Sequence, residues 1–272
     1  MPSLYIIQLI QNKYYIGKTN KLEKRLIEHT ENKGSKWTSI YYPINLIQII
    51  PNCDKYDEDM YTEIYMEKYG IENVRGGTYA QAKLDCLAQY FILYKLPRIT
   101  ISNNKKLPLY VLRLKNNKFL IERTNNIADR LQEHFDNKGT QWTQKYKPLL
   151  VVKRIDNPVD SFVESKITEM YMCKHGIDNV RGGVYTAMIL DPKIKAFLVR
   201  KCLSFRDCCF NCNKKGHFSK NCPKENRNSK YRYSRKKRNV LRSNVQSYNR
   251  LFHRRNTNYK RKVKVIKLGY YD

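Results

Sequence analysis

The sequence lacks long apolar runs and any secretory leader pattern. No stretch approaches the ~18 consecutive apolar residues of a membrane-spanning helix, so we expect no membrane partner. The first residues enter a strand-like pattern at once, without the basic and apolar regions of a signal peptide. We therefore predict an intracellular protein, nuclear or cytoplasmic, or one of a virion or viral factory if the source is viral, and not a secreted one.

Acidic residues are also scarce, since 24 Asp and Glu stand against 53 Lys and Arg and leave a net charge of +29. The excess is uneven, because residues 223–272 hold 17 Lys and Arg but only two acids. A surface this basic, interleaved with 22 Tyr, is typical of proteins that bind a polyanion. The composition therefore predicts nucleic acid as the partner, and the motifs described below favour DNA over RNA. The oligomeric state stays open.

Cysteine spacing shows no disulfide framework. Of the eight cysteines, three fall in one cluster and the others are scattered along the chain. We interpret the scattered ones, with Cys202 and Cys208 among them, as ordinary free thiols. Such thiols are expected in a reducing, intracellular compartment.

One segment of the chain occurs twice. The matched stretches are 14–20 with 119–125, 33–38 with 138–143, and 69–77 with 175–183. Residues kept in both copies are candidates for the fold, and residues kept in one copy are candidates for a task that only one copy performs. Trp37 and Trp142 are kept in both, which favours core packing over contact with a base.

The pattern predicts an α/β (α+β) architecture of two tandem small domains. Each domain is expected to hold a short, mainly antiparallel three-stranded sheet flanked by helices. The predicted parts are a first domain at 1–96, a linker at 97–106, a second domain at 107–204, a metal-binding module at 205–223 and a basic disordered tail at 224–272. Basic clusters at 235–238 and 260–262 in the tail suit phosphate binding, and a nuclear-localisation role stays open.

Local signals place the elements of the first copy. Residues 4–9 and 13–17 indicate a hairpin, and Asn20 with Glu23 indicates a capping box at the start of a helix. Residues 44–50 suit a buried strand, and a helix over 57–69 is expected to end at Gly70. Further helices are predicted over 79–95, before Pro97, and over 186–203.

A compact cluster near the C-terminal end has metal-ligand spacing. Its members are Cys209, Cys212, His217 and Cys222, in the order C-x2-C-x4-H-x4-C. Three thiolates and one imidazole suit tetrahedral Zn²⁺, and four protein ligands leave no open position, so the site should be structural. Gly216 permits the tight turn, while Phe210 and Phe218 are candidate platforms for base stacking. The segment resembles the zinc knuckle of retroviral nucleocapsid proteins.

The first copy also resembles the GIY-YIG nuclease family. The resemblance rests on Tyr5 in the first strand, Tyr15-Ile16-Gly17 in the second, Arg25 on the following helix, and an acidic helix before Asn73. It covers residues 1–77 and, in degraded form, 107–183. It implies hydrolysis of a phosphodiester with one divalent ion, Mg²⁺ or Mn²⁺. A strand tyrosine would help to activate water, an arginine would neutralise the phosphorane, and a helix glutamate would hold the metal.

Elementary chemistry assigns further residues to this site. Tyr5 and Tyr15 on adjacent strands would aim two hydroxyls at one point, with Arg25 and His29 on a helix above them. Candidate substrate contacts are Gly17, Lys18 and Asn73, although Asn73 also suits a cap of the turn that follows. The metal ligand is open between Glu58 and Glu63. Glu58 is preferred because it lies on the same helix face as Thr62, where the family places its glutamate.

The second copy keeps much of this pattern but departs at two positions. It retains Tyr110, Arg130, His134, Glu164 and Glu169, yet carries Leu120 in place of Tyr15 and Glu122 in place of Gly17. We predict a metal-dependent DNA endonuclease with a catalytic first copy. The second copy would be inactive and would bind nucleic acid or pack on its partner. Two alternatives stay open: a non-catalytic nucleic-acid-binding or packaging protein, and a structural scaffold that condenses nucleic acid.

Overall fold

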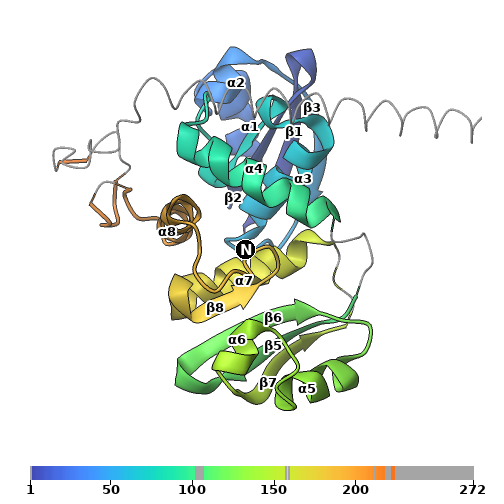
Figure 1. The fold of residues 1–272 in the computed structure, drawn as a ribbon. Helices are drawn as coiled ribbons and strands as arrows, with labels where there is room; N and C mark the ends of the chain where they lie inside the picture. The colour runs from blue at the N-terminus through green and yellow to red at the C-terminus, as the bar shows by residue number, and fades with distance from the viewer. Residues whose placement is uncertain are drawn as a thin grey trace, which may run out of the picture.

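The computed structural model describes residues 2–101, 107–156, 158, 160–210, 212–217 and 222–223. The predicted tail at 224–272 and the predicted stacking residue Phe218 lie outside the described residues. Each repeat folds into one four-stranded mixed sheet flanked by helices (Figure 1). The predicted α+β class is confirmed. Within the described residues, no helix is both long and apolar enough to cross a membrane.

The first sheet has the strand order β3-β1-β2-β4. Its strands are β1 (Ser3–Leu9), β2 (Lys13–Thr19), β3 (Pro43–Ile50) and β4 (Val74–Gly76). The hairpin of β1 and β2 is confirmed, and β3 pairs with β1 in antiparallel fashion. The short β4, which pairs with β2 in parallel, adds a fourth strand to the three that were expected.

The helices of the first repeat are α1 (Leu22–Thr30), α2 (Lys36–Ile40), α3 (Asp57–Tyr69) and α4 (Cys86–Ile101). The helix ending at Gly70 is confirmed, since Gly70 takes a positive φ of 99°. The predicted capping box at Asn20 is wrong. Helix α1 begins one residue later than that motif requires, with Lys21 at the N-cap and no side-chain cap bond.

Helix α4 begins later and ends later than predicted. The Asp85 carboxylate accepts a hydrogen bond from the Ala88 backbone N–H at 2.9 Å, which sets the start of the helix. The helix then continues through Pro97 to Ile101, so the first part of the predicted linker is helical. Residues 102–106 lie outside the described part of the chain. Asp191 likewise caps α8 and delays its start relative to the prediction.

The second repeat follows the same order of elements as the first. Its strands are β5 (Leu109–Leu114), β6 (Lys118–Arg123), β7 (Pro148–Ile155) and β8 (Val180–Gly182), and its helices are α5 (Ile127–Phe135), α6 (Gln141–Lys145), α7 (Phe162–His175) and α8 (Pro192–Phe205). The sheet order is β7-β5-β6-β8, which matches the first sheet strand for strand. Short 3₁₀ turns occupy Ile10–Asn12, Ile71–Asn73, Gly77–Tyr79, Lys115–Asn117 and Ile177–Asn179.

The burial predicted for residues 44–50 is wrong. They do form a strand, β3, but that strand is the outer edge of its sheet and its central residues are exposed. Ile44, for example, keeps 58% of its surface exposed. An apolar run cannot by itself distinguish a central strand from an edge strand, because sheet order depends on the rest of the fold.

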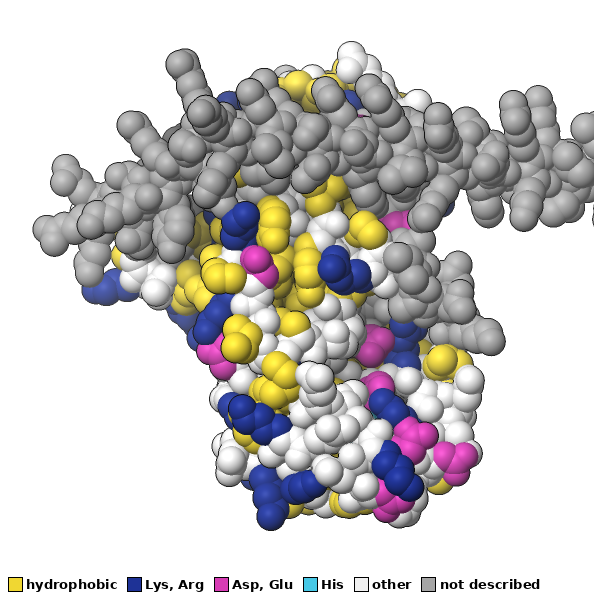
Figure 2. Space-filling model, in the orientation of Figure 1, with side chains coloured by type: hydrophobic (Ala, Val, Ile, Leu, Met, Phe, Trp, Pro, Cys, Tyr) yellow, Lys and Arg dark blue, Asp and Glu magenta, His cyan; other side chains and the backbone are white. Residues whose placement is uncertain are grey.

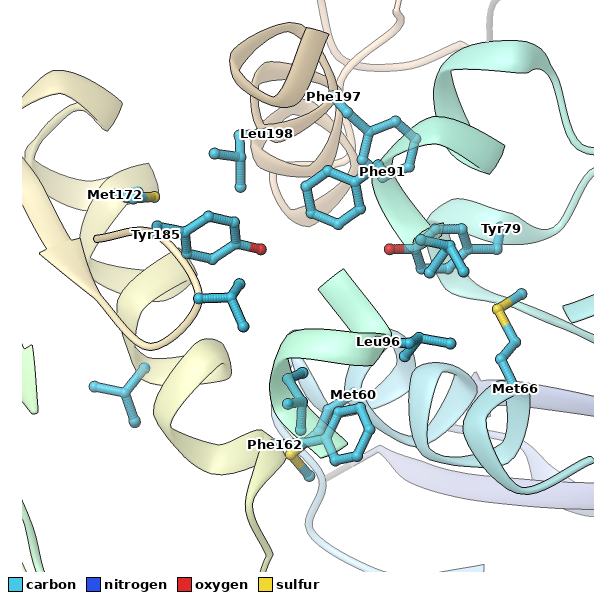
Figure 3. Packing of buried hydrophobic residues seen from close by; sticks show 14 of the residues in the cluster. Met60, Met66, Tyr79, Phe91, Leu96, Phe162, Met172, Tyr185, Phe197 and Leu198 are labelled. Atoms are coloured by element: carbon cyan, nitrogen blue, oxygen red, sulfur yellow. The ribbon is translucent and has the colours of Figure 1, made fainter. Parts of the chain in front are cut away.

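Helices α3, α4, α7 and α8 lie between the two sheets and share one hydrophobic core (Figure 1). The rings of Phe91 on α4 and Phe197 on α8 pack with centroids 4.4 Å apart. The hydroxyls of Tyr79 and Tyr185 point toward each other from opposite repeats (Figure 3). The repeats are therefore two halves of one folded body, and each covers apolar surface of the other.

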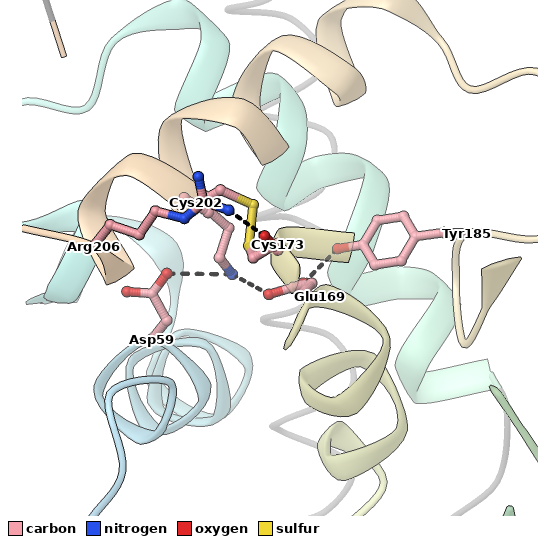
Figure 4. Close-up of a disulfide and its surroundings, with 7 residues drawn as sticks. Asp59, Glu169, Cys173, Tyr185, Cys202 and Arg206 are labelled. Atoms are coloured by element: carbon pink, nitrogen blue, oxygen red, sulfur yellow. Dashed lines mark hydrogen bonds and ion pairs between the residues drawn. A yellow bond between two sulfur atoms is a disulfide. The ribbon is translucent and has the colours of Figure 1, made fainter. Parts of the chain in front are cut away.

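The expectation that Cys202 is a free thiol is wrong. It forms a disulfide with Cys173 that joins α8 to α7 (Figure 4). The two cysteines are 29 residues apart in the sequence, and only the packing of the two helices brings them together. Cys208 is free, as expected.

Candidate active site and zinc centre

Tyr5 lies at the centre of the candidate site, buried on β1 and directly opposite Gly17 on β2. A Cβ atom added at Gly17 would lie 2.3 Å from the Tyr5 hydroxyl oxygen. Glycine therefore leaves the space into which the Tyr5 ring fits. The sequence did not reveal this steric reason for a glycine at position 17.

Two hydrogen bonds hold His29 of α1 beside Tyr5. Its Nε2 lies 2.8 Å from the Tyr5 hydroxyl, and its Nδ1 lies 2.8 Å from Thr38 Oγ1. The Thr38 hydroxyl donates to the Ser35 carbonyl at 2.9 Å, so it accepts from Nδ1–H. This pattern assigns the tautomer and leaves Nε2 to accept the Tyr5 proton. Burial, and then the nearby Arg25, lower the pKa of His29 to about 4, so the ring is neutral at pH 7.

Tyr15 and Arg25 complete the group around Tyr5. The ring centroid of Tyr15 lies 6.3 Å from that of Tyr5 and 5.0 Å from that of His29. Burial raises the pKa of both tyrosines, while the Arg25 guanidinium lies close enough to both hydroxyls to act in the opposite direction. Arg25 is half-buried and pairs with Glu28 at 2.7 Å, so one side of its guanidinium faces the tyrosines.

Glu58 stands next to this group in the first turn of α3. Among the described residues, the hydrogen bond to its carboxylate is a long one of 3.4 Å from the Gly77 backbone N–H. Burial, and then the neighbouring Asp59, raise the pKa of Glu58 to about 7, while Lys18 and Arg25 act in the opposite direction. Mg²⁺ is commonly held by one or two carboxylates with several waters, and a weakly bonded carboxylate fits that requirement.

Two of the predicted residues have other contacts. Both oxygens of Glu63 are engaged, with Tyr79, Lys95 and Lys201 as donors at 2.6–2.7 Å, in the buried layer between the repeats. Asn73 accepts from Lys13 Nζ at 2.7 Å and donates to the Tyr69 carbonyl, and Asn179 makes the same contacts in the second repeat.

These contacts favour Glu58 as the candidate metal ligand, which stays a prediction. The structure brings Glu58, and not Glu63, to the tyrosines, and it gives Asn73 a structural bond after α3. Trp37 is buried and donates to the Tyr14 carbonyl at 3.1 Å, in agreement with a core role. Sequence reasoning missed Thr38, although its recurrence as Thr143 was a usable signal.

The second repeat has the counterparts of these side chains, but a carboxylate of its own, that of Glu122, contacts them. The Glu122 carboxylate accepts hydrogen bonds from Tyr110 at 2.9 Å and from Arg130 Nη2 at 2.8 Å, and it lies 2.9 Å from His134 Nε2. These three residues correspond to Tyr5, Arg25 and His29 of the first repeat. Arg130 and His134 together hold the pKa of Glu122 below its usual value in spite of its burial.

The position of the candidate metal ligand also differs between the repeats. Glu164, the counterpart of Glu58, pairs with Arg123 at 2.6 Å and accepts from the Gly183 backbone N–H at 3.2 Å. In the first repeat Arg123 is replaced by Lys18, and no ion pair of Glu58 is formed within the described residues. The first repeat therefore keeps a carboxylate available where the second has neutralised it.

The predicted metal ligands near the C-terminal end come together in space. One ligand atom from each of Cys209, Cys212, His217 and Cys222 lies within 4.8 Å of the others. Gly216 has a φ of 92°, as the predicted tight turn requires, and Phe210 is exposed. Three sulfur ligands and one nitrogen ligand fit Zn²⁺.

Lys and Arg side chains also lie on the surface outside the zinc-binding module. Figure 2 shows Lys and Arg over both halves of the visible face, with Asp and Glu gathered mainly at one side of the lower half.

Comparisons with known proteins agree with these two sites. Residues 1–79 match the family model of the GIY-YIG catalytic domain, and residues 207–224 match that of the zinc knuckle. Both resemblances drawn from the sequence are confirmed. The chain is 34% identical over 64 residues to the UPF0213 protein YazA of Bacillus subtilis (strain 168), a match that covers 24% of this chain and 64% of that protein.

A UPF0213 protein of Bacillus cereus is 32% identical over 65 residues, which cover 24% of this chain and 62% of that protein. The chain thus spans less than two thirds of the length of these curated relatives. No solved structure matches the chain.

Proposed function

We propose that the protein is a metal-dependent DNA endonuclease whose first repeat carries the catalytic site. The observation that carries the proposal is the gathering of Tyr5, Tyr15, Arg25 and His29 around the bare backbone of Gly17, with Glu58 beside them. Hydrolysis of a phosphodiester needs a positioned water, neutralisation of the phosphate oxygens and a path for the proton. Each requirement has a candidate group here.

The residues of the chain divide this work. As the water oxygen bonds to phosphorus and the P–O bond to the leaving sugar oxygen breaks, Tyr5 takes a proton from the water and passes its own proton to Nε2 of His29, and the leaving oxygen takes up a proton from solvent. Arg25 neutralises part of the charge on the non-bridging oxygens. Negative charge that develops on the phosphate would raise the pKa of His29 and so counteract the effect of burial. Tyr15 orients the water or the phosphate from the adjacent strand. Bound Mg²⁺ or Mn²⁺, held by Glu58, would supply Lewis-acid charge on a phosphate oxygen.

The other parts of the chain would bind nucleic acid. The zinc knuckle offers Phe210 for base stacking, and the basic tail offers phosphate contacts. Attached binding modules raise the local concentration of substrate, so the catalytic repeat need not bind tightly by itself. Lys18 follows Gly17 on β2 and would contact a neighbouring phosphate.

A second candidate function is nucleic-acid binding or packaging without catalysis. One observation favours it: the second repeat keeps the complete fold although Glu122 and Arg123 engage the counterparts of the candidate catalytic side chains. The fold therefore does not require catalysis.

Nicking of supercoiled plasmid DNA with Mg²⁺ or Mn²⁺ tests the proposal. Wild type should produce nicked circles, and Arg25→Ala should lower the rate about 10²–10³-fold because it removes charge from the transition state. Arg130→Ala, the matched change in the second repeat, should leave the rate within about twofold, since that pocket is not used. Filter binding should be nearly equal for all three proteins. A wild type that binds several DNA structures but cuts none would favour the second candidate.

A further inference from the structure

The second repeat contains a group of donors that would suit a phosphate but already hold a carboxylate. Arg130 approaches Glu122 with two nitrogens, Nη2 at 2.8 Å from Oε1 and Nε at 3.3 Å from Oε2. Tyr110 donates to the same Oε2 at 2.9 Å. A guanidinium that grips two oxygens of one group is the usual arrangement for carboxylates and phosphates alike.

The side chains that hold Glu122 are ones that both repeats share. Tyr110, Arg130 and His134 occupy the register positions of Tyr5, Arg25 and His29. Thr143 holds His134 Nδ1 at 2.9 Å, just as Thr38 holds His29 at 2.8 Å. What is new is Glu122 itself, which stands at the position of Gly17 on the paired strand.

We propose that the second repeat retains a latent oxyanion site that can take phosphate or a phosphodiester, and that the Glu122 carboxylate occupies it as a built-in substitute for the ligand. The native chain therefore excludes nucleic-acid phosphate from this pocket. The second repeat supports the first through the shared core and does not contribute a second phosphate grip at this place.

The test measures phosphate binding and not cleavage. All proteins carry Arg25→Ala, which silences the anion site of the first repeat. Glu122→Ala is then added, because it removes the carboxylate but keeps the Cβ that this repeat already accommodates. Inorganic phosphate is titrated by calorimetry into the full-length proteins. We expect R25A/E122A to bind phosphate at least about tenfold more tightly than R25A alone, since the two Arg130 nitrogens that now contact Glu122 become free.

Two control variants test whether the gain in phosphate affinity comes from this site. Glu122→Gln in the same background keeps a side chain of the same size in the pocket and should leave phosphate affinity at the R25A level. Adding Arg130→Ala to R25A/E122A should abolish the gain, which separates this site from phosphate held by the basic tail. Glu122→Gly serves as a second opening variant if the alanine variant does not fold.

The proposal is overturned if folded R25A/E122A and R25A/E122G bind phosphate no more tightly than R25A. It is also overturned if the gain survives loss of Arg130. Because the measurement does not involve cutting, a first repeat that never nicks DNA would disprove the proposed function and leave this result intact.

Discussion

The candidate sites of the two repeats have diverged, whereas the layer between the repeats has kept its buried Glu, Tyr and Lys residues and differs at Asp59, whose counterpart is Ser165. In that layer each repeat contributes one glutamate, one tyrosine and one lysine at equivalent positions. They are Glu63, Tyr79 and Lys95 from the first repeat and Glu169, Tyr185 and Lys201 from the second. The lysines cross over: Lys201 pairs with Glu63 and with Glu169 at 2.7 Å each, and Lys95 pairs with both glutamates as well.

Figure 4 shows Glu169 and Tyr185 in this layer, together with Asp59 of the first repeat. Buried charges that lose a partner cost several kcal/mol, so neither repeat can change this layer alone without destabilising both. The difference teaches that the shared layer constrains both repeats together, whereas the two candidate sites can change separately.

The largest expected effect comes from making the first pocket like the second. Gly17→Glu would displace the Tyr5 ring, whose hydroxyl oxygen lies 2.3 Å from a Cβ at this position, and would place a carboxylate near Arg25, as Glu122 is placed against Arg130. Nicking should fall by more than about 10³-fold, because the substitution both blocks the phosphate position and neutralises the arginine. The protein should still unfold cooperatively, since the second repeat tolerates the same residue. A Gly17→Glu variant that nicks at a tenth of the wild-type rate or faster would contradict the comparison.

A change in the layer between the repeats should act on stability instead. Lys201→Met leaves Glu63, Glu169 and Asp59 without a buried cation that each now contacts at 2.7–3.3 Å. The free energy of unfolding should fall by about 3–5 kcal/mol, measured by urea denaturation. Lys195→Met on the same helix removes an exposed pair with Asp178 and should cost less than about 0.5 kcal/mol. Equal losses for the two variants would argue against the buried network.

The pH dependence of nicking should reflect Glu58. Its raised pKa of about 7 means that the carboxylate is protonated below that pH and ionised above it, and only the ionised form holds a metal. At limiting Mg²⁺ the rate should therefore fall about tenfold for each pH unit below 7 and level off above it. Higher Mg²⁺ should move the midpoint to lower pH, because the metal competes with the proton. A nicking rate that does not change between about pH 5.5 and pH 7 would contradict the assignment of Glu58 as the metal ligand.

The smallest expected effect is on binding by the knuckle. Cys212→Ser removes one of the four candidate zinc ligands, so the protein should lose its knuckle zinc, measured by elemental analysis. Affinity for single-stranded DNA should fall about fivefold, the effect of losing ~1 kcal/mol of base stacking. Unchanged zinc content and affinity would contradict the assignment, and the free Cys53→Ser is the matched control.

Much of the candidate site could be read from residue order because hairpins and short helices are local. The pairing of Tyr5 with Gly17 follows from a two-strand hairpin, and the α3 boundary follows from Gly70. The choice of Glu58 over Glu63 was open, since two acids on one helix differ only in which neighbours they meet. Thr38 escaped notice because its bond to His29 spans a loop between two helices.

By itself, the sequence determined the duplication, the two strands and helix that carry the candidate catalytic residues, and the zinc ligand set. These depend on short-range spacing, which a chain keeps in any fold. Only the tertiary structure decided the buried Lys and Glu layer, the Cys173–Cys202 disulfide, the exposed edge at β3 and the contacts of Glu122 with its neighbours in the second repeat. Each of these joins groups from separate elements, and the free energy that brings them together comes from packing two repeats on one core.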